Sequence, residues 1–164
     1  METTETLNET QLITKDQLLN QWLGQRKVTR RVLDAFPEKE LFEFTIGGMR
    51  TYAQLTKEML AMDGATAKGV ATGEWSTLDE EKPELTTKAD LLASWDESTE
   101  KIQKYWKQIS IKNFQEKVVA FGQYEGTGFS ILFYVMDNEI HHRGQGYVYL
   151  RALGITPPNF WEQY

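Results

Sequence analysis

The sequence contains no cysteine, and this absence removes several kinds of chemistry at once. A chain of 164 residues without cysteine has no disulfide bond, no thiolate metal ligand and no cysteine nucleophile. Because disulfides are common in secreted proteins and rare in reducing compartments, the composition favours the cytoplasm. The N-terminus agrees, since residues 1–10 are polar and acidic and lack the apolar core of a signal peptide.

Long apolar runs and an excess of basic charge are also missing. A membrane-spanning helix requires about 18 or more mostly apolar residues, and no segment approaches that length. The 18 Lys and Arg residues are outnumbered by 24 Asp and Glu, which gives a formal charge of −6. A surface of that sign repels phosphate backbones on average. We therefore expect neither a membrane nor a nucleic-acid partner, and we interpret the basic stretch at residues 26–31 as a solvated helix face.

The residues that are present are those of a globular protein. Hydrophobic residues make up 40% of the chain and aromatic residues 12%. A folded chain of this length buries about 70% of the surface that its unfolded form exposes, which is enough for one core. We expect a polar leader at residues 1–13, followed by a single domain over residues 14–164.

Apolar residues recur at three- and four-residue steps in four long segments, which is the spacing of amphipathic helices. The first segment, residues 15–35, follows Thr14, and Gln17 stands where a capping-box partner is needed. The second begins near Met49 and is expected to stop at residues 63–64. The third follows Thr86 or Thr87, and the fourth covers residues 128–153.

The segments between these helices differ in length. Residues 64–85 contain three glycines and one proline and predict a long connection with one short helix. Residues 110–128 predict a short extended segment or loop, and the aromatic tail at residues 160–164 is expected to fold back on the helices. Without a convincing set of strands, the chain is predicted to be an all-α four-helix bundle with a long connection between its second and third helices.

Polar residues gather in the fourth predicted helix. His141 and His142, the only two histidines, are adjacent and therefore point in different directions. His142 shares a helix face with Asn138 and Gln145, which are four and three residues away. Such groups bind zinc, nickel or iron, but a half-buried histidine is more often simply hydrogen-bonded. Both interpretations stay open at this point.

The stretch His141-His-Arg-Gly-Gln145, with Asp137-Asn-Glu-Ile140 before it, resembles the C-terminal helix of the DinB/YfiT-like metalloenzyme superfamily. Gly47-Gly-Met-Arg-Thr-Tyr-Ala-Gln-Leu55 resembles the family's entry to its second helix, and the likeness extends more loosely over nearly the whole chain. The resemblance implies a four-helix bundle, commonly a homodimer. It also implies one divalent metal held by three histidines, one from the second helix and two, four residues apart, from the fourth. Some members of the family are thiol transferases.

The chain departs from this pattern at two of the three positions. His142 matches the downstream histidine, but Asn138 stands four residues earlier and Glu58 falls on the position in the second helix. In one interpretation Glu58, Asn138 and His142 bind a divalent metal, with a preference shifted from Zn or Ni toward Mn or Fe because oxygen ligands are harder. In the other, metal is absent or weakly bound, and Glu58 and His142 form a buried ion pair or hydrogen bond with Asn138 beside it.

The residues around this set have expected roles of their own. Tyr52, Trp75, His141 and Gln145 are candidates for the lining of the site. Glu139 and His141 are expected at the rim or at a subunit interface.

Three further residues of the fourth helix complete these expectations. Asp137 is expected to take the place of a metal ligand only if the fourth helix is rotated about its axis. Arg143 is expected to pair with an acidic side chain, and Gly144 is expected to allow close helix packing.

Two functions follow from these alternatives. The first is a metal-dependent transferase or hydrolase, in which the metal polarises a thiol or a water and Glu58 or His142 is ligand or base. The second is a non-catalytic, dimeric helical bundle that binds a small molecule or a protein partner. The loss of two of the three expected ligands favours the second function more than the family name suggests.

Overall fold

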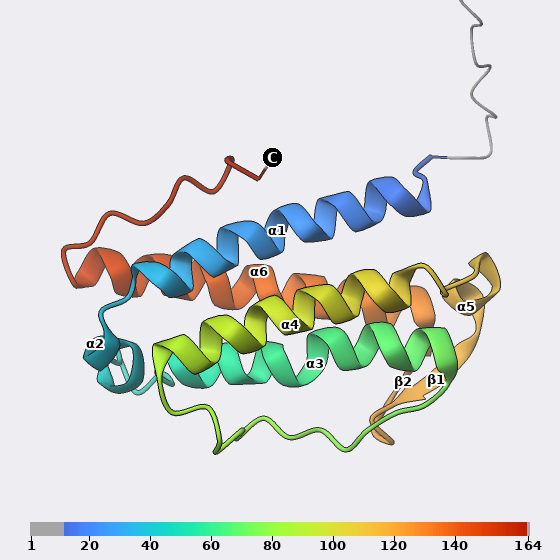
Figure 1. Ribbon diagram of the computed structural model, residues 1–164, viewed down its shortest axis with the longest axis horizontal. Helices are drawn as coiled ribbons and strands as arrows, with labels where there is room; N and C mark the ends of the chain where they lie inside the picture. Colours follow the sequence, from blue (N-terminus) through green and yellow to red (C-terminus); the bar gives the residue numbers. More distant parts are fainter. Residues whose placement is uncertain (1–11, 164) are drawn as a thin grey trace, which may run out of the picture.

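The structure is a computed structural model that describes residues 12–163, and its architecture is a bundle of helices with one small hairpin (Figure 1). The elements in chain order are α1 (Lys15–Ala35), α2 (Glu38–Glu43), α3 (Tyr52–Thr72), α4 (Lys88–Trp106), α5 (Ile111–Gln115), β1 (Lys117–Ala120), β2 (Tyr124–Thr127) and α6 (Gly128–Ala152). The mostly helical fold is as predicted, with α2 and α5 as two short helices that the sequence did not indicate. Of the expected leader, residues 1–11 lie outside the described part.

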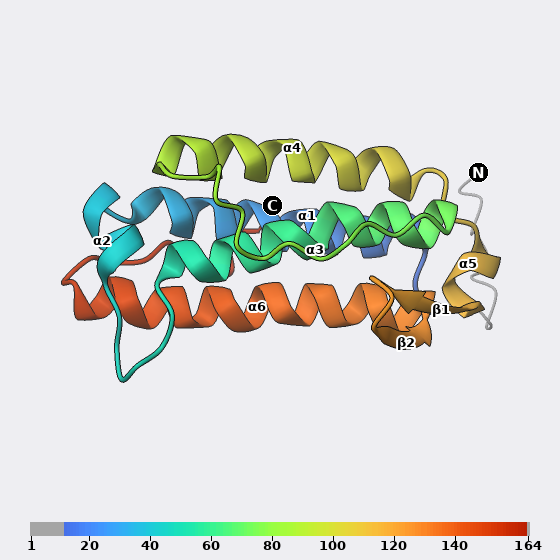
Figure 2. The same ribbon diagram turned by 90° about the horizontal axis from the view of Figure 1, so that it is seen from below.

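The four long helices lie side by side along one axis. Figures 1 and 2 show α2 at one end of α1, α3, α4 and α6, and α5 with the hairpin at the other end. Within residues 12–163 no helix is long and apolar enough to cross a membrane.

Capping boxes fix the starts of three long helices. In each, a threonine hydroxyl accepts the backbone N–H of the third helical residue, whose side chain accepts the threonine N–H in return. The pairs are Thr14 with Gln17, Thr51 with Gln54, and Thr87 with Asp90. The predicted starts after Thr14 and Thr87 are therefore correct, whereas α3 begins at Tyr52, three residues after the predicted Met49.

The predicted end of the second helix was wrong. The helix continues through Asp63 and Gly64 to Thr72, so the short helix expected in the following connection is in fact the last part of α3. Asp63 does not stop the helix, because its carboxylate turns into the core and pairs with Arg26. The helix ends at Gly73, whose φ of 75° lies in the left-handed region that glycine adopts without strain.

The segment before α6 forms a β-hairpin. β1 pairs with β2 in antiparallel register, with Lys117 opposite Thr127 and Ala120 opposite Tyr124. The expected extended segment is thus present. Each strand has only four residues, which is too short for a clear alternating pattern.

The C-terminal tail folds back along α1, as predicted (Figure 1). Arg31 of α1 holds it with its guanidinium, which pairs with the Glu162 carboxylate at 2.9 Å and donates to the Glu162 carbonyl at 2.8 Å.

The helices α3 and α6 pack as antiparallel neighbours along what we call the α3–α6 seam (Figure 2). Facing residues run in opposite order along the two helices: Tyr52 with Gly146, Glu58 with His142, Met62 with Asn138, and Val70 with Gly128. This register places the residue aligned with the family's second-helix ligand directly opposite the histidine of α6.

Candidate functional site

Glu58 and His142 are in direct contact across the α3–α6 seam. Oε1 of Glu58 lies 3.0 Å from Nε2 of His142, and the two side chains expose only 13% and 6% of their surface. A carboxylate oxygen is an acceptor, so the imidazole donates at Nε2. The structure therefore shows a Glu58–His142 pair like that of the second interpretation of the sequence.

Each member of this pair has a second partner. Nη2 of Arg50 lies 2.5 Å from Oε2 of Glu58, and Nδ1 of His142 lies 2.7 Å from Oε1 of Gln145. Both ring nitrogens of His142 are therefore within hydrogen-bond distance of a side chain. We call Arg50, Glu58, His142 and Gln145 the polar chain.

Arg50 is the member of the polar chain that the sequence did not indicate. It lies in the loop before α3, where periodicity gives no side-chain direction. Its backbone is fixed by Tyr149 of α6, a fully buried residue whose hydroxyl donates to the Arg50 carbonyl at 2.7 Å. An aromatic residue two turns after His142 thus holds in place the cation that pairs with Glu58.

The polar chain keeps Glu58 ionised. The hydrogen bond from His142 lowers the pKa of Glu58 to about 2, and the ion pair with Arg50 acts in the same direction against the effect of burial. The carboxylate is therefore an anion with both oxygens engaged throughout the neutral pH range.

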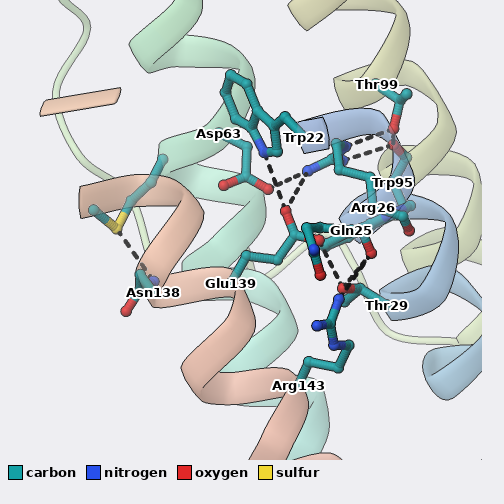
Figure 3. Close-up of polar contacts among 11 residues, drawn as sticks. Trp22, Gln25, Arg26, Thr29, Asp63, Trp95, Thr99, Asn138, Glu139 and Arg143 are labelled. Carbon is teal, nitrogen blue, oxygen red and sulfur yellow. Dashed lines mark hydrogen bonds and ion pairs between the residues drawn. The ribbon is translucent and has the colours of Figure 1, made fainter. Parts of the chain in front are cut away.

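Asn138 does not join this chain. It lies one helical turn from His142, and its Nδ2 is 3.9 Å from Sδ of Met62 (Figure 3). The three proposed metal ligands thus lie along the same seam, but only Glu58 and His142 bond to each other.

These residues do not fit the metal that the family resemblance implies. Both oxygens of Glu58 and both nitrogens of His142 already have partners, and the amide nitrogen of Asn138 faces a sulfur atom. A guanidinium 2.5 Å from the carboxylate also opposes a second cation there. In the part of the chain that the structure describes, no three His, Asp or Glu side chains are grouped so that they could hold a metal ion.

The other predicted lining residues lie in different surroundings. Tyr52 is fully buried and its ring stacks on Phe36 at 4.6 Å, and burial raises the pKa of its hydroxyl. Trp75 packs against Phe121 at a centroid distance of 5.3 Å, close to the hairpin. Tyr52 and Trp75 therefore do not wall one cavity. His141 is exposed, with its ring centroid 5.1 Å from that of His142.

Glu139 was expected at the rim or at an interface, and this prediction was wrong. The residue is fully buried, and its Oε1 accepts a hydrogen bond from the Thr29 hydroxyl at 2.6 Å (Figure 3). Its Oε2 accepts from Nε1 of Trp22 at 3.3 Å and lies 3.6 Å from Nη1 of Arg26. The helix is rotated so that position 139 faces α1, while the neighbouring Ile140 is 41% exposed.

Two other expectations for α6 were also wrong. Arg143 makes no ion pair within residues 12–163, and its Nη1 instead donates to the Gln25 carbonyl at 3.1 Å. Gly144 faces open space, whereas a Cβ at Gly146 would collide with the ring of Tyr52. The glycine that permits close helix packing is therefore Gly146.

Glu139 belongs to a polar layer in the middle of the bundle. Arg26 pairs with Asp63 and lies beside Glu139, so one guanidinium serves two carboxylates (Figure 3). Burial raises the pKa of Asp63 to about 8 and also raises the pKa of Glu139. This layer lies between two apolar clusters and has no path to solvent through its carboxylates, each at most 1% exposed.

A hollow lies away from the polar chain, between α3, α4 and the connection that joins them. It has a volume of about 530 Å³ and a polar lining that includes Ser98 and Lys101. None of the residues predicted from the sequence as site residues lines it.

Comparison with known proteins agrees with the fold. The model of the DinB family matches residues 1–163, and the chain therefore belongs to the DinB family. The uncharacterised protein YjoA of Bacillus subtilis (strain 168) is 25% identical over 151 residues, which are 90% of this chain and 96% of YjoA.

Solved structures of similar proteins show the same architecture. The DinB-like protein YjoA of Bacillus subtilis superposes with a TM-score of 0.71 at 25% identity, over 90% of this chain and 98% of that one. A DinB-like protein of Bacillus cereus ATCC 10987 gives 0.69 at 17% identity, over 88% and 95%. A member of the family from Exiguobacterium sibiricum 255-15 gives 0.64 at 18% identity, over 88% and 95%.

Proposed function

We propose that this protein is a metal-independent member of the DinB family that binds a small molecule at the polar chain. The observation that carries the proposal is the double engagement of Glu58, by Arg50 at 2.5 Å and by His142 at 3.0 Å. Arg50 supplies the positive charge that a divalent metal supplies in the three-histidine site implied by the family resemblance.

The polar chain suits ligand binding because it is already formed without a ligand and is partly exposed to solvent. The seam fixes Glu58 and His142 before any ligand arrives, which lowers the cost of ordering on binding. Arg50 is 47% exposed, and only its Nη2 has a side-chain partner among residues 12–163. The remaining guanidinium N–H groups are free to donate to a ligand.

The competing function, a metal-dependent transferase or hydrolase, requires a different arrangement of the same residues. Arg50 would have to leave Glu58, and one ring nitrogen of His142 would have to leave its present partner before it could ligate a metal. Each change breaks a bond of the polar chain, so the geometry supports binding without a metal better than metal catalysis.

The test is the metal content of the purified protein. We expect far less than one metal per chain after growth with added Mn, Fe, Ni or Zn, measured by elemental mass spectrometry. The control is the double variant Glu58→His with Asn138→His, which with His142 restores the three imidazoles of the family pattern and is expected to retain Ni or Zn. A wild-type protein with about one metal per chain, lost in both Glu58→Ala and His142→Ala, would overturn the proposal.

We also propose that the protein is a homodimer, as the family resemblance implies, and that α6 forms its interface. Exposed apolar side chains follow one stripe of α6: Phe129, Ile140 and Val148. Phe129, Ile140 and Val148 are 47%, 41% and 59% exposed. An exposed apolar stripe of this kind is typical of a protein–protein contact.

The stripe is complementary to itself when two α6 helices pair in antiparallel order about Gly144. That pairing brings Ile140 opposite Val148 and Asp137 opposite Arg151, because each pair is equally distant from residue 144. Gly144 has open space around it, so two helices can approach closely there. Asp137 and Arg151 have no ion-pair partner within the described chain, which leaves both free for this contact.

A further inference from the structure

The α3–α6 seam contains a second feature beside the polar chain, a pocket of about 280 Å³ under the hairpin. Its walls are mainly apolar and come from α3, the hairpin and α6: Met62, Phe121, Tyr124, Ile131, Tyr134 and Val135. The single charged residue of its lining, Glu125, lies 4.0 Å from Lys117 on the neighbouring strand. The pocket therefore offers space for an apolar group and no cation of its own.

The pocket and the polar chain lie next to each other along the seam. Met62 lines the pocket and also receives the Asn138 amide at 3.9 Å. Met62 and Asn138 each lie four residues from the Glu58–His142 pair on their own helices. At 1.5 Å per residue the pocket therefore begins about 6 Å from that pair.

We call Arg50, Asn138 and the pocket together the groove. Its polar end and its apolar end suit different chemical groups. At the polar end, Arg50 has free N–H groups and the Asn138 amide donates only to a sulfur, which is a weak acceptor. Both side chains therefore offer donors to an acceptor group. At the other end, the apolar walls exclude charge.

We propose that the groove binds a medium-chain monocarboxylate, with its carboxylate on Arg50 and Asn138 and its hydrocarbon chain in the pocket. A planar carboxylate matches the forked donors of a guanidinium. A multiply charged anion such as a phosphate ester is disfavoured, because the ionised Glu58 lies beside the same guanidinium. This inference rests on the proposed function, since it assigns a ligand class to the same metal-free site.

The experiment uses three probes with the same chain and different heads: decanoate, decylamine and decanol, each titrated into the full-length protein by calorimetry. We expect decanoate to bind and decylamine not to bind. Arg50→Gln is expected to weaken decanoate by about tenfold or more and to leave decanol unchanged, because only the charge-assisted contact is removed. Tyr134→Asp, at a residue 57% exposed, is expected to weaken both by placing a charge at the pocket.

Two matched variants control for general effects. Arg30→Gln removes a half-exposed arginine that is paired with Asp96 on the other side of the bundle, and Val119→Asp places a charge on the hairpin at a position 52% exposed, outside the pocket. Neither should change decanoate binding.

The outcomes separate this inference from the proposed function. Absent decanoate binding, equal binding of decylamine, or unchanged binding in Arg50→Gln each overturns the ligand assignment, whatever the metal content. A stoichiometric metal overturns the proposed function, whatever the ligand. Binding of decanoate that both Arg50→Gln and Tyr134→Asp weaken, and that both controls leave intact, supports the inference.

Discussion

Arg26 of α1 and Asp63 of α3 form an ion pair in the centre of the bundle, where each side chain exposes 1% of its surface. The same guanidinium donates from Nε to the Thr99 hydroxyl at 2.7 Å and from Nη2 to the Trp95 carbonyl at 3.1 Å. It also lies 3.6 Å from Glu139 of α6. Arg26 thus contacts the other three long helices. All of its contacts form together only in one relative arrangement of the four helices.

Removing this guanidinium leaves two buried acidic side chains, Asp63 and Glu139, without their shared polar partner. We expect Arg26→Met to lower the free energy of unfolding by about 3–5 kcal/mol, measured by urea denaturation. The control is Arg30→Met, which breaks the exposed pair with Asp96 and should cost about 0–1 kcal/mol. A cost below about 1 kcal/mol for Arg26→Met would show that the polar layer contributes little to stability.

The raised pKa of Asp63 predicts a pH dependence of stability. Burial raises it from 3.8 to about 8, so the folded state binds a proton that the unfolded state releases. The resulting stability is fully present below pH 3.8 and is lost as the pH rises toward 8. Asp63→Asn removes this dependence.

The measurement is the free energy of unfolding of wild type and Asp63→Asn at pH 5, 7 and 9. The stability of the variant relative to wild type should increase between pH 5 and 9. Glu139 contributes to the raised pKa of Asp63 and has a pKa shifted in the same direction, so the difference reports Asp63 together with its interaction with Glu139. Parallel pH profiles would contradict the prediction.

The lowered pKa of Glu58 predicts a pH dependence of stability with the opposite sign, a loss in acid. The pKa of Glu58 is lowered from 4.5 to about 2, so its contribution is present above pH 4.5 and is lost as the pH falls toward 2. We expect Glu58→Gln to lose about 1–2 kcal/mol relative to wild type at pH 6 and much less at pH 2.5. Glu97→Gln, on the exposed surface of α4, is the matched control. An equal loss at both pH values would mean that ionisation of Glu58 is not what stabilises the fold.

The elements that the sequence predicted correctly are those set by local signals. The start of α1 follows from a threonine and a glutamine three residues apart, and the last helix ends at Ala152, one residue before its predicted end. These features depend on backbone hydrogen bonds within a few residues, so neighbouring side chains are sufficient to identify them.

The features that the sequence did not predict depend on distant partners. Asp63-Gly64 reads locally as a helix stop, but Asp63 is held in the helix by an arginine of α1, 37 residues away. Glu139 is buried because α6 is rotated toward α1, and a helix with both apolar and polar residues on every side gives no clear periodicity to fix that rotation. The position of Arg50 could not be predicted either, because it depends on the hydrogen bond from the Tyr149 hydroxyl of α6 to the Arg50 carbonyl.

Two glycines of α6, only two residues apart, are expected to respond oppositely to alanine. A Cβ at Gly146 would collide with the Tyr52 ring, so Gly146→Ala should destabilise the fold by about 1–3 kcal/mol. A Cβ at Gly144 meets no atom within 4 Å, so Gly144→Ala should raise stability by up to about 1 kcal/mol through helix propensity. Thermal unfolding at low protein concentration measures both. Equal effects would contradict the packing assigned to Gly146.

The proposed dimer predicts a specific pattern of charge reversal on α6. Ile140→Glu should give a monomer in light scattering at micromolar concentration, because it buries a carboxylate opposite Val148. Asp137→Arg should weaken association, since it places two arginines opposite each other at both ends of a symmetric contact. Combining it with Arg151→Asp restores opposite charges only if the helices pair in antiparallel order about Gly144. Recovery of the dimer in the double variant would therefore identify the register, and a wild-type monomer would show that the stripe has another partner.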